Sequence, residues 1–197
     1  GQLDPAEQTI ERSLAIAPRN ANGSHYKSHL HYERGETEAG YAYLVDWMQD
    51  YPREALMHCH NNWHIGLWAL ARGDVDRMWQ VVDAHVDPRA ASGPPLNNMT
   101  DIAAILYRAE LAGVEVPAER WQVVSDFGAK IFPKPGLAFA DVHVALAHAM
   151  AGRSEDLERI VKDAKGPARD LAFEYIRKAP KQIQTPYREA FENRFKL

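Results

Sequence analysis

The sequence has a single cysteine, Cys59, and no long hydrophobic run. One cysteine excludes an intrachain disulfide and a cysteine-rich zinc site. No apolar stretch approaches the ~18 residues that a membrane-spanning helix needs. A signal peptide is not recognisable either, although the chain starts at Gly1 instead of methionine. We therefore expect a cytoplasmic protein without a membrane partner.

Charge of one sign is also lacking, because the formal net charge is only −4 at pH 7. Such a balance gives no reason to expect a nucleic acid as partner. The segment 165–197 is locally basic, which a solvated helix face explains more simply than a polyanion site does. Glycine-rich phosphate loops, Gly-x-Ser-x-Gly elbows and dinucleotide-binding fingerprints are absent from the sequence, and nothing else in it specifies a nucleotide.

Glycine, in contrast, is present at regular intervals. Four glycines that each close an apolar, helix-patterned segment recur about every 39 residues, at Gly35, Gly73, Gly113 and Gly152. Glycine is favoured just past a helix end because it adopts positive φ without a Cβ penalty. The spacing falls in the size range of helical-hairpin repeats, although a strict tetratricopeptide period is about 34 residues. We predict an all-α fold, a tetratricopeptide-like α-solenoid that forms a single domain over residues 1–197.

Helical periodicity extends along almost the whole chain, and strand-like alternation is not evident. Asp4 and Pro5 supply a helix N-cap followed by a proline at the first helical position. Start and stop signals of this kind predict helices over residues 4–17, 24–34, 36–50, 53–72, 74–86, 100–112, 117–131, 139–151, 154–164, 167–178 and 185–195. The main predicted loops cover residues 87–98 and 132–137.

The first predicted helix looks like the second half of a hairpin, because it is followed by a proline turn and has no partner before it. A solenoid unit cannot bury its apolar face alone. We therefore expect either that the chain is a piece of a longer protein or that this helix packs in place of a missing cap. This helix without a partner could also pack against a second copy of the chain, so self-association stays an alternative.

Histidine provides the most informative pattern. Two His-x-x-x-His doublets, His25/His29 and His60/His64, each precede a helix-closing glycine. Residues four apart share one helix face, so each doublet directs two imidazoles the same way. Zinc and iron sites on helices use this spacing. Glu33, four residues after His29, extends the first ridge. The doublets therefore make a divalent transition-metal site formed by the four histidines one hypothesis for this cluster.

A third helix contributes to the same hypothesis. His25, His64 and His143 precede their closing glycines by nine or ten residues. Equivalent helices of a solenoid stack side by side, so similar offsets predict similar height and convergence of the three side chains. Other histidines, His31, His58 and His85, fall off the common faces, and we predict that they are at the surface. Cys59 diverges from its histidine neighbours by about 100° on a helix, which argues against a Cys–His dyad.

Two other interpretations of the cluster stay open. A His/Asn/Glu/Trp network between stacked helices would fix the register of the fold, a documented use of buried polar groups. A pocket without metal would use an imidazole as general base, because imidazole titrates near neutral pH. The zincin protease motif is a poor match because Asn61 stands where that motif has glutamate.

Several segments together resemble the tetratricopeptide repeat protein 38 family. They are SHLHYERGE, the tryptophan of VDWM, HCHNNWHIGLWALARGD, ILYRAELAGVEV, ERW and FADVHVALAHAMAG, which span about residues 18–152. The resemblance implies a helical-repeat fold but no established reaction. Its motif positions here are His25, His29, Glu33, Gly35, Trp47, His60, Asn62, Trp63, His64, Trp68, Arg108, Glu110, Trp121, Asp141 and His143. The final segment, KAPKQIQTPYREAFENRFKL, departs from the family pattern.

Two classes of function are consistent with the sequence. The first is a binding module whose concave helical surface holds a protein or peptide partner, as helical repeats mostly do. The alternative is an enzyme or small-ligand binder that uses an inward-facing His/Glu cluster with or without a metal. The pocket candidates are His25, His29, Glu33, His60, Trp63, His64, Arg108, Asp141 and His143. The sequence does not decide whether the protein is an enzyme, because fold alone does not assign chemistry.

Overall fold

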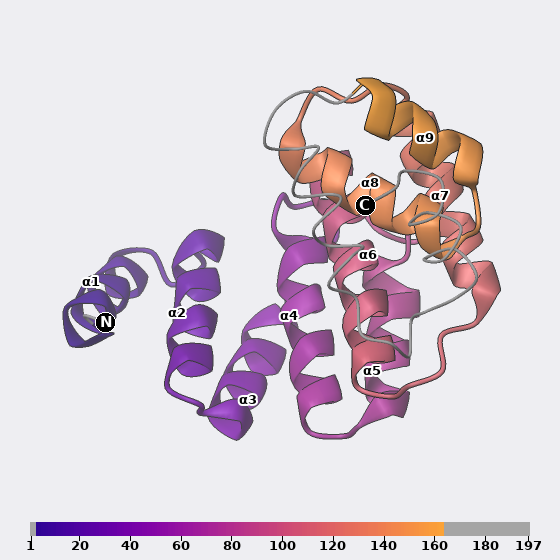
Figure 1. The fold of residues 1–197 in the computed structure, drawn as a ribbon. Helices are drawn as coiled ribbons and strands as arrows, with labels where there is room; N and C mark the ends of the chain where they lie inside the picture. Colours follow the sequence, from indigo (N-terminus) through magenta and orange to yellow (C-terminus); the bar gives the residue numbers. More distant parts are fainter. Residues whose placement is uncertain (1–2, 164–197) are drawn as a thin grey trace. The chain divides into compact units, whose positions relative to one another are not determined.

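The computed structural model describes residues 3–163, and all regular structure in this part of the chain is helical (Figure 1). The elements are α1 (Leu3–Ile16), α2 (Ala21–Glu33), α3 (Thr37–Met48), α4 (His58–Ala71), α5 (Val75–Val81), the π-helix η1 (Val82–Val86), α6 (Pro95–Leu111), α7 (Ala118–Ile131), α8 (Ala138–Met150) and α9 (Ser154–Asp163). The prediction of an all-α fold is thus confirmed over these residues. The predicted helices 167–178 and 185–195 and the basic segment lie outside them. Within residues 3–163, no helix has the length and apolarity required to cross a membrane.

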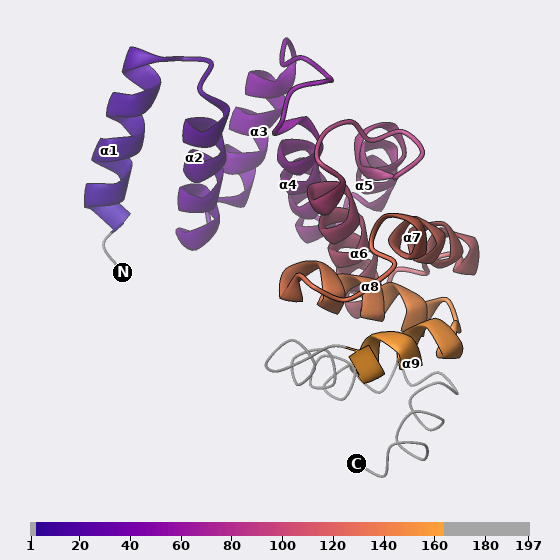
Figure 2. The same cartoon turned by 90° about the horizontal axis from the view of Figure 1, so that it is seen from above.

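The chain divides into two compact units, residues 1–94 and the part that begins at Pro95. In the first unit each helix packs against the next in chain order, from α1 to α5 (Figures 1 and 2). The π-helix η1 packs against α4 and α5. In the second unit α8 contacts α6, α7 and α9. The single domain expected over residues 1–197 stays a prediction.

The four regularly spaced glycines all end helices in the predicted way. Each has positive φ, between 70° and 81°, at Gly35, Gly73, Gly113 and Gly152. At Gly73, the glycine N–H donates to the carbonyl oxygen of Leu70, and the next N–H, of Asp74, donates to that of Ala69. The same pair of hydrogen bonds closes the other three helices. This is the Schellman arrangement, which satisfies carbonyl groups that a helix end would otherwise leave without a donor.

Several helix boundaries differ from the prediction. Helix α4 begins at His58 and not at residue 53, because residues 53–57 form turns. The Arg53 guanidinium in these turns donates to the carbonyl oxygens of Ala84 and Ala90. The predicted helix 74–86 changes at Val82 from α to π geometry. Helix α6 begins at residue 95, earlier than predicted, because a proline is well accommodated at the first helical position.

The core of the first unit lies between α3, α4 and α5. Its buried members are Leu44, Trp47, Met48, Ile65, Trp68 and Val81. The Trp47 indole N–H donates to the Pro18 carbonyl oxygen at 3.0 Å, and the Arg19 guanidinium covers the Trp47 ring at 4.5 Å. Burial of these large side chains is the main stabilising contribution. It fixes the α3–α4 pair, and α3 also packs against α2.

The core of the second unit contains a buried polar pair. Ser125 of α7 and His148 of α8 are both buried, and the Ser125 hydroxyl oxygen lies 2.7 Å from His148 Nδ1. Burial lowers the pKa of His148 to about 4, against the opposing effect of Asp156. The neutral imidazole is therefore the form that the folded protein holds at pH 7, and protonation opposes folding.

We expect the stability of the protein to fall as the pH decreases from 6.5 towards 4 because of His148. The folded pKa is lowered, so the unfolded chain takes up the proton first, and the stabilisation present above pH 6.5 is lost through this window. The full contribution is about 3 kcal/mol at 1.36 kcal/mol per pKa unit. Urea unfolding across this pH range should show a shallower dependence for His148→Gln than for the parent. If the free energy of unfolding depended on pH in the same way in both proteins, His148 would not be the source of this pH dependence.

Candidate metal centre

Helix α2 presents the first histidine doublet. Its N-terminus is capped by Asn20, whose side-chain oxygen accepts from the Gly23 N–H at 3.2 Å. From this start, His25 and His29 lie one turn apart, and their Nε2 atoms are 2.9 Å from each other. His25 is half-buried and His29 is exposed. The spacing of four therefore places both imidazoles on one face, as the sequence predicts.

Helix α4 presents the second doublet from the interior of the first unit. His60 is half-buried, and His64 is buried. The Trp63 indole stacks on the His60 ring with a centroid separation of 5.2 Å and an interplanar angle of 16°. The rings of His60 and His64 are 5.0 Å apart. The indole of Trp63 thus packs directly against the His60 ring.

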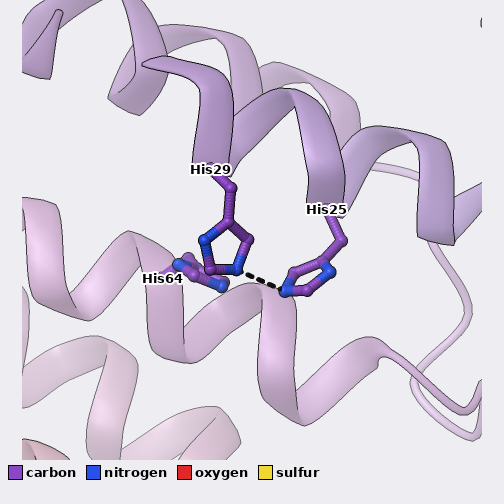
Figure 3. Close-up of side chains that lie close together, drawn as sticks. All are labelled: His25, His29 and His64. Carbon is purple, nitrogen blue, oxygen red and sulfur yellow. Dashed lines mark hydrogen bonds between the residues drawn. The ribbon is translucent and has the colours of Figure 1, made fainter. Parts of the chain in front are cut away.

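The two doublets meet. His60 Nε2 lies 3.0 Å from His25 Nε2, and the His64 ring lies 5.0 Å from the His25 ring and 4.8 Å from the His29 ring. One ligand atom each from His25, His29 and His64 can be chosen so that all three are within 4.8 Å of one another (Figure 3). We refer to His25, His29, His60 and His64 as the histidine cluster. The four residues predicted as metal ligands are thus brought together.

The cluster favours neutral imidazoles. Burial, together with the charges of His60 and His29 when protonated, lowers the pKa of His25 to about 4. Burial and His60 likewise lower the pKa of His29, and Glu33 partly offsets this effect. A neutral imidazole has the lone pair that a metal ion needs. At neutral pH, His25 and His29 are therefore in the ligating form.

Glu33 stands beside the cluster and not within it. It is exposed and lies outside the group of three potential ligands. Its negative charge nevertheless partly offsets the lowering of the His29 pKa. The ridge predicted from the sequence therefore consists of two histidines with a carboxylate close enough to act on one of them electrostatically. Trp63, another predicted pocket residue, contacts His60 and His64 directly.

The remaining predicted site residues belong to the second unit. The N–H group of His143 Nδ1 donates to the Phe139 carbonyl oxygen at 2.7 Å, and the carboxylate of Asp141 accepts from the Gly136 N–H at 3.1 Å. Arg108 is exposed; burial, together with the positive charge of Arg108, lowers the pKa of His143 against the effects of Phe139 and Asp101. The convergence of His143 with His25 and His64 joins residues of two different units and stays a prediction.

The prediction that His58 lies at the surface is wrong. His58 is only 6% exposed, and its ring packs edge-on against His85, which is itself half-buried, at 5.1 Å. The Asn62 side-chain N–H donates to the His58 carbonyl oxygen at 2.9 Å. The spacing of four between His58 and Asn62 was a usable signal for this contact. The pairing with His85 was not predictable, because it depends on the π-helix.

No protein-family model matches the chain, and no solved structure matches it either.

Proposed function

We propose that this protein binds a divalent transition metal ion through His25, His29 and His64, with His60 beside them. One observation carries the proposal: the Nε2 atom of His25 has two other Nε2 atoms, of His29 and His60, at 2.9 Å and 3.0 Å. A ring nitrogen of neutral histidine has either one proton or one lone pair. It can form one good hydrogen bond in its plane and not two. A shared cation, in contrast, accommodates several nitrogen lone pairs directed at one point.

The distances support the same conclusion. Zinc–nitrogen bonds of 2.0–2.1 Å imply that two tetrahedral ligands are roughly 3.3 Å apart. The observed separation of 2.9 Å between the Nε2 atoms of His25 and His29 is a few tenths of an ångström shorter. Small side-chain rotations would therefore make room for the ion, without any change in the course of α2 or α4.

The chemistry of the donors specifies the class of metal. Imidazole suits zinc, copper, iron and nickel, whereas magnesium and calcium prefer oxygen ligands. Three or four imidazoles without a carboxylate in the first coordination sphere favour zinc or copper over manganese. The cluster lies wholly in the first unit, so metal binding does not depend on where the second unit sits.

The test is metal analysis by mass spectrometry of tag-free protein purified without chelator, beside a His60→Ala/His64→Ala double variant. We expect about one equivalent of zinc or copper in the parent and a large loss in the variant. Zinc at 100 times its dissociation constant should also stabilise the parent by about 2.7 kcal/mol. A well-folded parent that contains no metal and takes up none would overturn the proposal. The cluster would then be a structural network or a metal-free pocket.

The second candidate is the binding module. Support for it comes from the stacked helices α1–α5 and the repeated glycine caps, since folds of stacked helical hairpins mostly bind other proteins. With it we propose a tetratricopeptide-like repeat of about 39 residues, a cytoplasmic location and the family resemblance given above. A protein or peptide partner and self-association are compatible with a bound metal, so the two candidates do not compete for the same residues.

A further inference from the structure

The histidine cluster differs from a purely structural metal site in its charge. Structural zinc sites are dominated by thiolates that neutralise the ion, whereas catalytic sites keep an open position for water. All members of this cluster are imidazoles, which bind a metal ion as neutral ligands. An ion bound here would therefore retain its full double charge. High residual charge is what acidifies a bound water molecule.

The cluster also has an accessible side. His64 is buried and closes one side of the site, but His29 is exposed and His25 is half-buried. An ion among these three imidazoles would thus be reachable from solvent on the His29 side. Tyr26, which is 59% exposed, lies with its ring 5.6 Å from the His25 ring and adds aromatic surface next to this opening.

The fourth histidine is placed differently from the other three. The group whose ligand atoms are all within 4.8 Å of one another consists of His25, His29 and His64, and His60 lies outside it. The stacking contact with Trp63 holds the His60 ring in its position. Three ligands and one position left for water is the arrangement of many catalytic zinc sites.

We infer that the ion held by His25, His29 and His64 keeps an exchangeable coordination position on the His29 side, and that the water bound there hydrolyses small esters with an aromatic group. This inference rests on the proposed metal binding. A bound ion would lower the pKa of this water, which would then lose one proton to solvent. The resulting hydroxide adds to the ester carbonyl carbon, the bond from this carbon to the leaving oxygen breaks, and the alcohol takes up a proton. The products are one carboxylic acid and one alcohol, and the ion is unchanged.

The experiment uses the full chain loaded with cobalt(II), whose visible bands report its coordination. Titration with azide should change these bands in a saturable way, and azide should inhibit hydrolysis of p-nitrophenyl acetate over the same concentration range. The zinc-loaded protein should hydrolyse this ester at least about tenfold faster than the metal-free protein or free zinc. His31→Ala should keep the cobalt bands and their response to azide, because His31 lies against Glu36 and outside the histidine cluster. Tyr26→Ala should slow ester hydrolysis and leave the bands unchanged.

The outcomes separate the two proposals. Bound cobalt with bands that azide does not change would mean a closed site. This result would overturn the inference and leave metal binding standing, as would azide exchange without hydrolysis above the controls. If the parent bound no cobalt at all, both proposals would fail.

Discussion

Replacing His25 with alanine is expected to weaken zinc binding on the order of 100-fold. Structural zinc binds to four-ligand sites with roughly 10–16 kcal/mol, so one ligand accounts for roughly 3 kcal/mol. His25 is the best single residue to test because its Nε2 atom makes both short contacts, to His29 and to His60. The measurement is a competition titration of the purified protein with a chromophoric zinc chelator.

The matched control is His31→Ala on the same helix. His31 Nδ1 lies 2.7 Å from a carboxylate oxygen of Glu36, and His31 is not a member of the cluster. This variant removes one imidazole from α2 but should keep the zinc affinity of the parent. Equal losses in the two variants would show that zinc binds to surface histidines in general, and the metal centre would then be wrong.

Replacing Gly40 with alanine is expected to destabilise the first unit by about 3 kcal/mol, the upper part of the range for overpacking of a core. A Cβ atom at Gly40 would lie 2.5 Å from Cζ2 of Trp68 and 2.8 Å from Cβ of His31. The tryptophan belongs to the buried core cluster, so its ring has little freedom to move away. The quantity to measure is the free energy of unfolding in urea.

Gly35→Ala is the matched comparison for this variant. A Cβ atom at Gly35 would meet nothing within 4 Å, but φ is +70°, so the cost is only the strain of a left-handed residue. That strain is roughly 1–2 kcal/mol. Gly40→Ala should therefore be clearly less stable than Gly35→Ala. If the order were reversed, the close approach of α3 to α4 at Gly40 would be incorrect.

Local chemistry made the helices and most of their ends predictable. Gly73 illustrates why: the helix-ending hydrogen bonds involve only residues within five positions of one another. Because such hydrogen bonds join residues close together in the chain, the local sequence is enough to predict them. At the start of α4, which the sequence did not predict, a distant group is involved. The start of α4 depends on turns in which Arg53 donates to Ala84 and Ala90, more than thirty residues away.

The candidate site was predictable in part for the same reason. A spacing of four determines that His25 and His29 share a face, and likewise His60 and His64, whatever surrounds the helices. That the two doublets would meet was a hypothesis, because contact between α2 and α4 side chains depends on the packing of the intervening α3, where Gly40 allows the close approach of Trp68 of α4. His58, predicted at the surface, is buried against His85 because η1 carries that ring towards α4.

By itself, the sequence determined an all-helical chain over the described residues, the capped helix ends and the faces on which the histidines lie. These properties follow from interactions within one or two helical turns. Only the tertiary structure decided that His25, His29 and His64 form one group, that His60 stands outside it against Trp63, and that His29 is exposed. Distance and burial between helices arise from the packing of the whole first unit, and no local pattern contains them.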